Sequence, residues 1–247
     1  MKIKDFFDDF AFHARVMPVL VIFCPIFLIG IFNGIIYDSW VENTFLMFIC
    51  LVFLTITSKI ARNLGKEYET KMYKKLGGIP STIVLRFSDS TFDSVTKQRY
   101  HKKLNKIEGI KLPLQSTDEV PEDDEQYTSA ATMLRNYANS HRETEQRVYQ
   151  ELKEYNFWRN LYGTKWFALL FYLVIAIREI ILKKPIALKQ VLLCPYPDYI
   201  TLLILLLSIV ILAFFVNQKV VQQKAFDYAK TLIEVCERIP EGKQNKK

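Results

Sequence analysis

The chain has 247 residues, of which 50% are hydrophobic, and a formal net charge of +7. The hydrophobic residues form long uninterrupted runs without helical or strand periodicity, which is the pattern of a membrane protein. The four cysteines lie far apart and lack the CxxC or CxxH spacing of a metal or redox site, so we expect them to be small core or lipid-facing residues.

The segment before the first apolar run predicts a short amphipathic helix. Ile3, Phe6, Phe7 and Phe10 recur at spacings of three and four residues, with charged side chains between them. Such a helix would lie along the membrane surface on its phenylalanines. The alternative is that this segment is simply the frayed start of the first membrane span.

Two membrane spans are predicted in the first quarter of the chain. Residues 16–37 contain no charged residue over 22 positions, which corresponds to about 33 Å of helix and crosses the hydrocarbon core. The second span is centred on 45–57 and reaches spanning length within 40–61. Near its end, the hydroxyls of Thr55 and Thr57 could line a polar lumen, but we expect them to bond back to their own helix.

Two further spans are predicted at 166–182 and 199–216. Arg178 and Glu179 interrupt the third near its end, where we expect their polar tips to reach the interface rather than a pore mouth. Basic residues are frequent at both membrane-proximal ends of the segment 58–165 and follow the last span, whereas the loop between spans one and two has none. The positive-inside rule therefore predicts that both termini and the middle segment are cytoplasmic, although three lysines between spans three and four oppose this orientation.

The excess positive charge is concentrated in residues 58–111, which hold thirteen Lys and Arg against five Asp and Glu. Within this segment, 94–107 predicts a helix capped by Asp93 or Ser94. Its apolar side chains fall on one side and a row of cations on the other. The run 81–87, STIVLRF, predicts a short strand.

An acidic block follows the basic one. Residues 112–157 carry ten Asp and Glu against four bases, and the two blocks could pair. The acidic block predicts a long helix that starts near Pro121 and runs to about Trp158, with a break near Asn139 and Ser140. After the last span, apolar residues recur in 221–235 at coiled-coil spacing, which indicates either a coiled-coil seam or packing within the chain.

Three interpretations of the basic helix remain open: it binds an anionic ligand, pairs with the acidic helix, or attracts anionic lipid. The sequence lacks HExxH, GxSxG and phosphate-loop motifs, so we predict that the protein is not an enzyme and needs neither a cofactor nor a metal. The candidate ligand-binding residues are Lys74, Lys75, Arg86, Lys97, Arg99, His101, Lys102, Lys103 and Lys106.

Three motifs resemble those of a bacterial family of four-span inner-membrane proteins. GGIPST at 77–82 is similar to a GGxPTT turn, TKQRYH at 96–101 to a TKxRYH segment, and WRNLYGTK at 158–165 to RRNLxGxK. Ser81 and Trp158 depart from the pattern, which has threonine and arginine there. The resemblance covers roughly residues 65–170.

The family looks like the membrane partner of nucleotidyltransferases in antiphage defence, in particular the channel effector of the Hailong type. The resemblance implies a homo-oligomeric ion channel, with a tetramer favoured, held shut by a single-stranded DNA oligomer in a basic cytoplasmic chamber. A cyclic-nucleotide-sensing effector or a membrane scaffold without conductance is the alternative.

The predicted fold is mainly α, with four transmembrane helices and a mixed, mostly helical cytoplasmic insert between spans two and three. The predicted order is an interfacial helix at 1–15, transmembrane helices 1 and 2 at 16–61, a cytoplasmic domain at 62–164, transmembrane helices 3 and 4 at 165–216, and a cytoplasmic C-terminal helix at 217–247.

Overall fold

The computed structural model describes residues 9–32, 40–107, 109–116, 123–183 and 197–239. The described residues are mainly helical, which confirms the predicted fold class at this level. They divide into two compact units, each described by itself. The apolar unit comprises 1–68 and 156–221, and the charged unit comprises 69–155 and 222–247.

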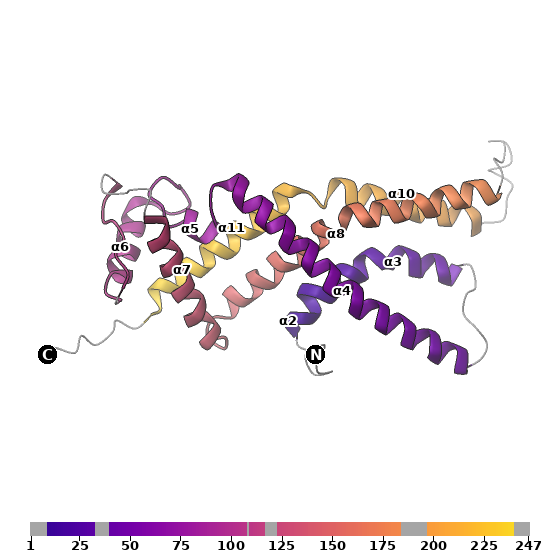
Figure 1. Cartoon of the computed structure of the whole chain (residues 1–247), viewed down its shortest axis with the longest axis horizontal. Coiled ribbons are helices and arrows are strands. Elements are labelled where there is room, and N and C mark those ends of the chain that lie inside the picture. Colours follow the sequence, from indigo (N-terminus) through magenta and orange to yellow (C-terminus); the bar gives the residue numbers. More distant parts are fainter. Residues whose placement is uncertain (1–8, 33–39, 108, 117–122, 184–196, 240–247) are drawn as a thin grey trace. The chain divides into compact units, whose positions relative to one another are not determined.

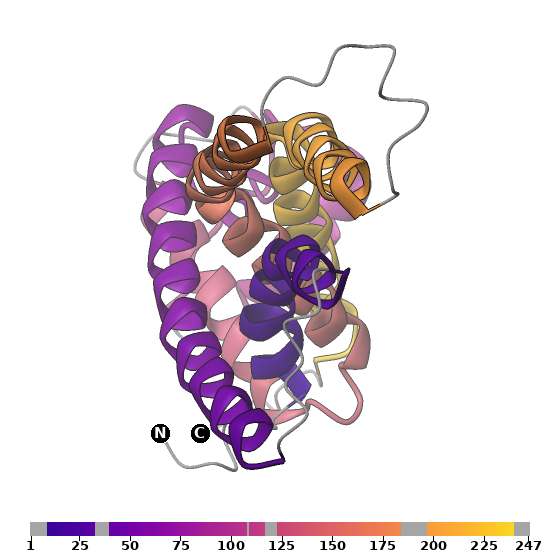
Figure 2. The same cartoon turned by 90° about the vertical axis from the view of Figure 1, so that its right-hand side faces the viewer.

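Helices make up the apolar unit (Figures 1 and 2). They are α2 (Asp9–Ala11), a π-helical turn at Phe12–Val16, α3 (Met17–Phe32), the first part of α4 (Trp40–Leu76), the second part of α8 (Gln146–Lys183), and α10 (Pro197–Phe214). Helices α8 and α10 lie side by side in both views.

Two to three helical stretches among the described residues are long and apolar enough to cross a membrane. Two are Asp9–Ile29 and Met47–Ile83. A third is Thr201–Phe214 taken together with Gln218–Glu237, a pair bent by 54°. A membrane protein is therefore supported, and the count of four spans stays a prediction.

The described N-terminal residues continue directly into the first apolar helix. Asp9–Ala11 and the turn at Phe12–Val16 lead without a break into α3, with Ala14 and Val16 buried. Residues 1–8, which carry most of the predicted amphipathic pattern, lie outside the described residues. The described part thus fits the alternative that this segment begins the first span.

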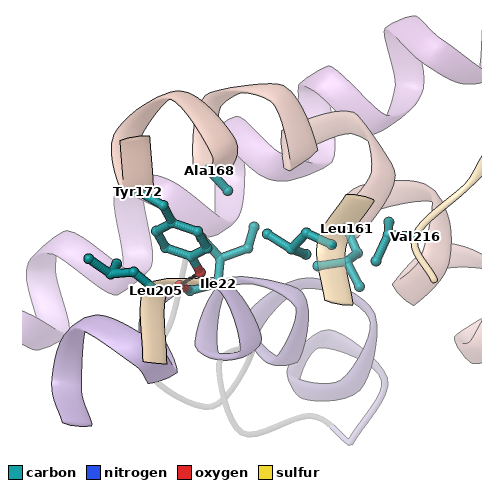
Figure 3. Packing of buried hydrophobic residues seen from close by; sticks show 7 residues of the cluster. Ile22, Leu161, Ala168, Tyr172, Leu205 and Val216 are labelled. Carbon is teal, nitrogen blue, oxygen red and sulfur yellow. Dashed lines mark hydrogen bonds between the residues drawn. The ribbon is translucent and has the colours of Figure 1, made fainter. Parts of the chain in front are cut away.

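A hydrophobic core joins α3, α8 and α10 (Figure 3). The Tyr172 ring lies against Ile22 and Leu205 in this core, and its hydroxyl donates a hydrogen bond to the Ile22 carbonyl. A buried tyrosine hydroxyl needs such a partner, because an unpaired polar group is unfavourable in an apolar environment. The core residues are Ile22, Leu161, Ala168, Tyr172, Leu205, Leu212 and Val216.

Helices α4 and α8 approach each other closely at two glycines. A Cβ atom on Gly163 would lie 2.5 Å from the Gly65 nitrogen, and one on Gly65 would lie 3.0 Å from the Asn160 Cα. Beside this crossing, the Asn160 amide donates to the Ala14 carbonyl at 2.6 Å. Glycine is therefore required at position 163, where backbone occupies the space that a side chain would take, whereas at Gly65 the nearest atom is the Asn160 side-chain oxygen at 2.4 Å.

The hydroxyls near the end of the second predicted span bond to their own helix, as expected. Thr55 Oγ1 donates to the Leu51 carbonyl and Thr57 Oγ1 to the Phe53 carbonyl, both at 2.8 Å. These bonds satisfy the hydroxyls locally.

The charged unit contains α5 (Pro80–Ile83), α6 (Ser94–Leu104), α7 (Asp123–Ser140), most of α11 (Gln218–Glu234) and a 3-10 turn at Val235–Glu237, together with the adjoining parts of α4 and α8. The break predicted near Asn139 and Ser140 is confirmed, because α7 ends at Ser140 and α8 begins at Gln146.

The strand predicted at 81–87 is wrong. Pro80–Ile83 forms one turn of helix, with Pro80 in its first turn and extended Ile79 as its N-cap. Proline is favoured there because its fixed φ suits a helix start and its missing N–H needs no partner. Val84 and Leu85 are fully buried. The β-branched run therefore marks burial and not sheet pairing.

The apolar seam of the C-terminal helix packs within the chain. Val221, Ala225, Tyr228, Leu232 and Val235 are each at most 8% exposed. This burial supports intramolecular packing over a coiled coil between chains. Burial also raises the pKa of the Tyr228 hydroxyl above its usual value.

Candidate anion-binding site

Helix α6 presents the basic segment on a well-formed amphipathic scaffold. The Asp93 side chain accepts a hydrogen bond from the Thr96 backbone N–H at 2.8 Å, which confirms the predicted N-cap. Hydrogen bonding to the Thr96 side chain, together with this backbone bond, lowers the pKa of the Asp93 carboxyl. Tyr100 and Leu104 bury one face of the helix at 4% and 1% exposure.

Lys97, a predicted ligand residue, lies inside this scaffold. Its side chain is 2% exposed, and its ammonium donates to the carbonyls of Arg86, at 2.6 Å, and Asp89. A buried ammonium that donates to two carbonyls fixes the loop before α6. The geometry thus gives Lys97 a structural role.

His101 is buried in the same way. Its Nδ1 lies 2.6 Å from the Pro113 carbonyl oxygen and its Nε2 lies 3.0 Å from the Leu85 carbonyl oxygen. The rings of Phe87 and Tyr127 pack beside it. His101 therefore joins α6 to the segments on either side of it and does not lie on the exposed face of the helix.

The other cations of this segment gather around one open pocket. Arg99, Lys102 and Lys103 of α6 and Lys106 of the turn that follows it line this pocket, which has a volume of about 700 Å³. We call these four residues the cation row. Its other described lining residues are Val95, Gln98, Tyr100 and Glu237. The row is thus accessible and is not buried against the acidic block.

Glu237 contributes a carboxylate to this pocket, and no sequence pattern indicated it. Its Oε1 accepts from Arg99 Nη2 at 2.6 Å and from the Tyr100 hydroxyl at 3.1 Å, and Lys103 Nζ donates to its carbonyl at 2.9 Å. A separation of 138 residues between Arg99 and Glu237 leaves no local signal of this contact. The side chain lies here because the buried seam of α11 brings the turn that follows it to α6.

Tyr100 and Arg99, which line the pocket, are protonated and can donate hydrogen bonds to an anion. Burial, aided by the Glu237 charge, raises the pKa of Tyr100 to about 12. The Tyr100 hydroxyl is therefore protonated at neutral pH and can donate. The hydrogen bond to Glu237 raises the pKa of Arg99 further above its already high value, so its guanidinium is always charged.

Three other predicted ligand residues lie outside the pocket lining. Arg86 pairs with Asp124 at 2.5 Å and donates to the Gly77 carbonyl at 2.9 Å. This contact links the basic and acidic blocks, as one of the three interpretations expected, but through the loop before α6 and not through the cation row. Lys74 and Lys75 are exposed in the last turn of α4, where cations favour the helix dipole.

The motifs that carry the family resemblance have local structural roles here. Gly77 has a φ of 75° after the end of α4, a conformation that glycine adopts without strain. Lys165 Nζ donates to the carbonyls of Ala213 and Val216 at 3.0 and 2.8 Å, which satisfies groups at the end of α10. Of the cation row, Arg99 alone belongs to a motif.

Replacing Lys97 by methionine is expected to destabilise the charged unit, whereas the same change at Lys102 is expected to be neutral. Loss of the buried ammonium removes a donor from each of the Arg86 and Asp89 carbonyls, which costs about 2 kcal/mol. Thermal unfolding of the detergent-solubilised protein measures the difference. Equal melting temperatures for Lys97→Met and Lys102→Met would show that Lys97 is not a structural residue.

No protein-family model, curated protein or solved structure matches this chain. Among the described residues, no group of three or more His, Cys, Asp or Glu side chains is placed to hold a metal ion. The cation row supports non-covalent, electrostatic binding of an anion.

Proposed function

We propose that this protein is a membrane channel whose conductance is controlled by an anionic nucleic-acid ligand bound to the cation row of α6. The observation that carries the proposal is the open pocket lined by Arg99, Lys102, Lys103 and Lys106, of which Lys103 is half-buried and the other three are exposed. Their spacing along α6 and the turn that follows it suits successive phosphates of a flexible backbone. The row provides no pattern of donors and acceptors for reading bases, so binding is expected to be independent of sequence.

Assembly of several chains would strengthen this binding. A polyanion that reaches the cation rows of several subunits releases more counterions, so affinity rises steeply with the number of contacts and falls with salt. A homo-oligomer is also what a pore built from two to three apolar helices per chain requires. The resemblance implies an oligomer in the bacterial inner membrane, for which we favour a tetramer, and the positive-inside rule predicts that both termini are cytoplasmic.

Ligand and pore are coupled if the ligand prefers one conformation of the channel. A single-stranded DNA oligomer that binds the closed state better than the open state holds the channel shut, and its loss shifts the population towards the open state. The resemblance makes the ligand the product of a nucleotidyltransferase and makes the protein an effector of antiphage defence. Opening on infection would then collapse the ion gradients of the cell.

A planar-bilayer recording of the purified protein tests this proposal. We expect conductance in the absence of nucleic acid and its suppression by a single-stranded oligothymidylate of roughly 15 nucleotides, a length that one to a few protein modules can cover. Heat-denatured protein in the same bilayers is the control for leakage. Silent membranes with and without oligonucleotide would overturn the channel proposal.

The length dependence of binding separates this function from the cyclic-nucleotide alternative. A short cyclic ligand needs a compact pocket that surrounds it, whereas the pocket on α6 is open along a row of cations. We therefore expect affinity to increase from a dinucleotide to an oligonucleotide. Tighter binding of a cyclic dinucleotide than of the oligonucleotide would favour the non-conducting effector instead.

A further inference from the structure

Glu237 places a negative charge inside the pocket that we assign to an anion. We infer that its carboxylate occupies a phosphate position of the site and competes with the ligand for Arg99 and Tyr100. This inference rests on the proposed function and adds the residue that limits affinity at that site. It identifies Arg99 and Tyr100 as one phosphate subsite within the cation row.

Two donors converge on one carboxylate oxygen of Glu237. Arg99 Nη2 and the Tyr100 hydroxyl both donate to Glu237 Oε1, at 2.6 and 3.1 Å. A charged nitrogen and a hydroxyl directed at the same anionic oxygen are an arrangement that also suits a phosphate oxygen. The position is therefore already shaped for an anion, and Glu237 fills it.

The Glu237 carboxylate can rotate out of the pocket while the backbone around it keeps its position. Val235 and Cys236 are fully buried. Arg238 is bonded to the 3% exposed carboxylate of Glu145, with its closest contact at 2.6 Å. Lys103 holds the Glu237 carbonyl at 2.9 Å. Rotation of one side chain is thus enough to open the subsite.

The ion pair between Arg99 and Glu237, which the ligand must replace, is weak. The side chains of Arg99 and Glu237 are 59% and 51% exposed, and ion pairs this exposed contribute little free energy because water and salt screen them. A phosphate chain gains contacts to Lys102 and Lys106 at the same time. The ligand therefore displaces Glu237. Because Glu237 competes for the same donors, a higher ligand concentration is needed for binding.

The test compares two single-charge removals in the C-terminal segment. Glu237→Gln removes the competing charge, and Glu234→Gln removes an equal charge from a residue that pairs with Arg147 at 3.4 Å and is not among the pocket-lining residues. We expect Glu237→Gln to bind a fluorescein-labelled oligothymidylate about fivefold more tightly than the wild type, since an exposed ion pair is lost. Glu234→Gln is expected to match the wild type.

A double-mutant cycle ties the effect to the subsite. In an Arg99→Ala background, Glu237→Gln is expected to change affinity less than twofold, because the charge no longer blocks a guanidinium. Melting curves of the full-length protein in detergent check that each variant is folded.

The outcomes separate the inference from the proposed function. Failure of both wild type and Glu237→Gln to bind would overturn the proposed function. Equal affinities of Glu237→Gln and Glu234→Gln, with the wild type binding, would overturn the inference alone. An undiminished gain in the Arg99→Ala background would also overturn it, because the gain would then reflect general charge.

Discussion

Reversing the four charges of the cation row to glutamate is expected to abolish binding of single-stranded oligonucleotide, with a loss of roughly 100-fold or more in affinity. Each cation removed eliminates a phosphate contact and each glutamate added repels the backbone. The fold should persist because Lys102 and Lys106 are exposed and the Arg99 ion pair is exposed and weak. The half-buried Lys103 loses one hydrogen bond, to the Glu237 carbonyl, which costs about 1 kcal/mol. The variant is Arg99→Glu with Lys102→Glu, Lys103→Glu and Lys106→Glu. Fluorescence anisotropy of the labelled oligonucleotide at several salt concentrations measures the change.

A pair of double variants provides the matched comparison. Lys102→Glu with Lys106→Glu and Lys74→Glu with Lys75→Glu change the net charge by the same amount within the charged unit. Lys102 and Lys106 line the pocket, whereas Lys74 and Lys75 lie at the end of α4 and are not among its lining residues. We expect the first pair to lose far more affinity than the second. Similar losses would mean that overall charge, and not the cation row, determines binding.

The variant with all four charges reversed is also expected to affect the growth of cells. If the bound oligomer holds the channel closed, a variant unable to bind it should be open without infection and toxic on expression. Growth after induction, together with an immunoblot of the membrane fraction, measures this. Normal growth of cells that contain the well-expressed variant would contradict the direction of gating proposed here.

Periodicity made the outward face of α6 predictable. A helix places residues three and four apart on one side, so the row could be identified from its spacing, and the cap could be narrowed to Asp93 or Ser94 from residue type and position. The buried face was less predictable because Lys97 and His101 are polar residues that usually remain exposed. Their burial depends on carbonyls supplied by segments around 85–89 and 113, which α6 alone does not specify.

Contacts between distant segments limited the remaining predictions. The run at 81–87 has strand composition, but burial without a described strand partner gives it helical and turn conformations instead. Glu237 reaches α6 only after α11 has packed in the charged unit, so its place in the pocket follows from tertiary structure. The approach of Gly65 and Gly163 is similar, since each glycine is ordinary in its own helix.

Replacing Gly163 by alanine is expected to destabilise the apolar unit severely, although alanine is ordinarily the better helix former by about 1 kcal/mol. The added Cβ would lie 2.5 Å from the Gly65 nitrogen, 2.7 Å from the Leu64 carbonyl carbon and 2.8 Å from the Gly65 Cα. These are backbone atoms, which cannot move aside without displacing α4. Overpacking of this kind costs about 3 kcal/mol or more, which corresponds to a fall of roughly 10 °C in melting temperature.

Alanine is expected to be less destabilising at Gly65 than at Gly163. The nearest atom to a Cβ on Gly65 is the Asn160 side-chain oxygen at 2.4 Å, and the nearest backbone atom lies at 3.0 Å. The Asn160 side chain can rotate at the cost of its hydrogen bond to the Ala14 carbonyl, which is cheaper than displacing backbone. Gly65→Ala is therefore expected to lower the melting temperature less than Gly163→Ala. Ala213→Leu, which adds volume at an exposed position of α10, is the control and should be close to neutral. A Gly163→Ala protein as stable as this control would show that α4 and α8 do not cross at these residues.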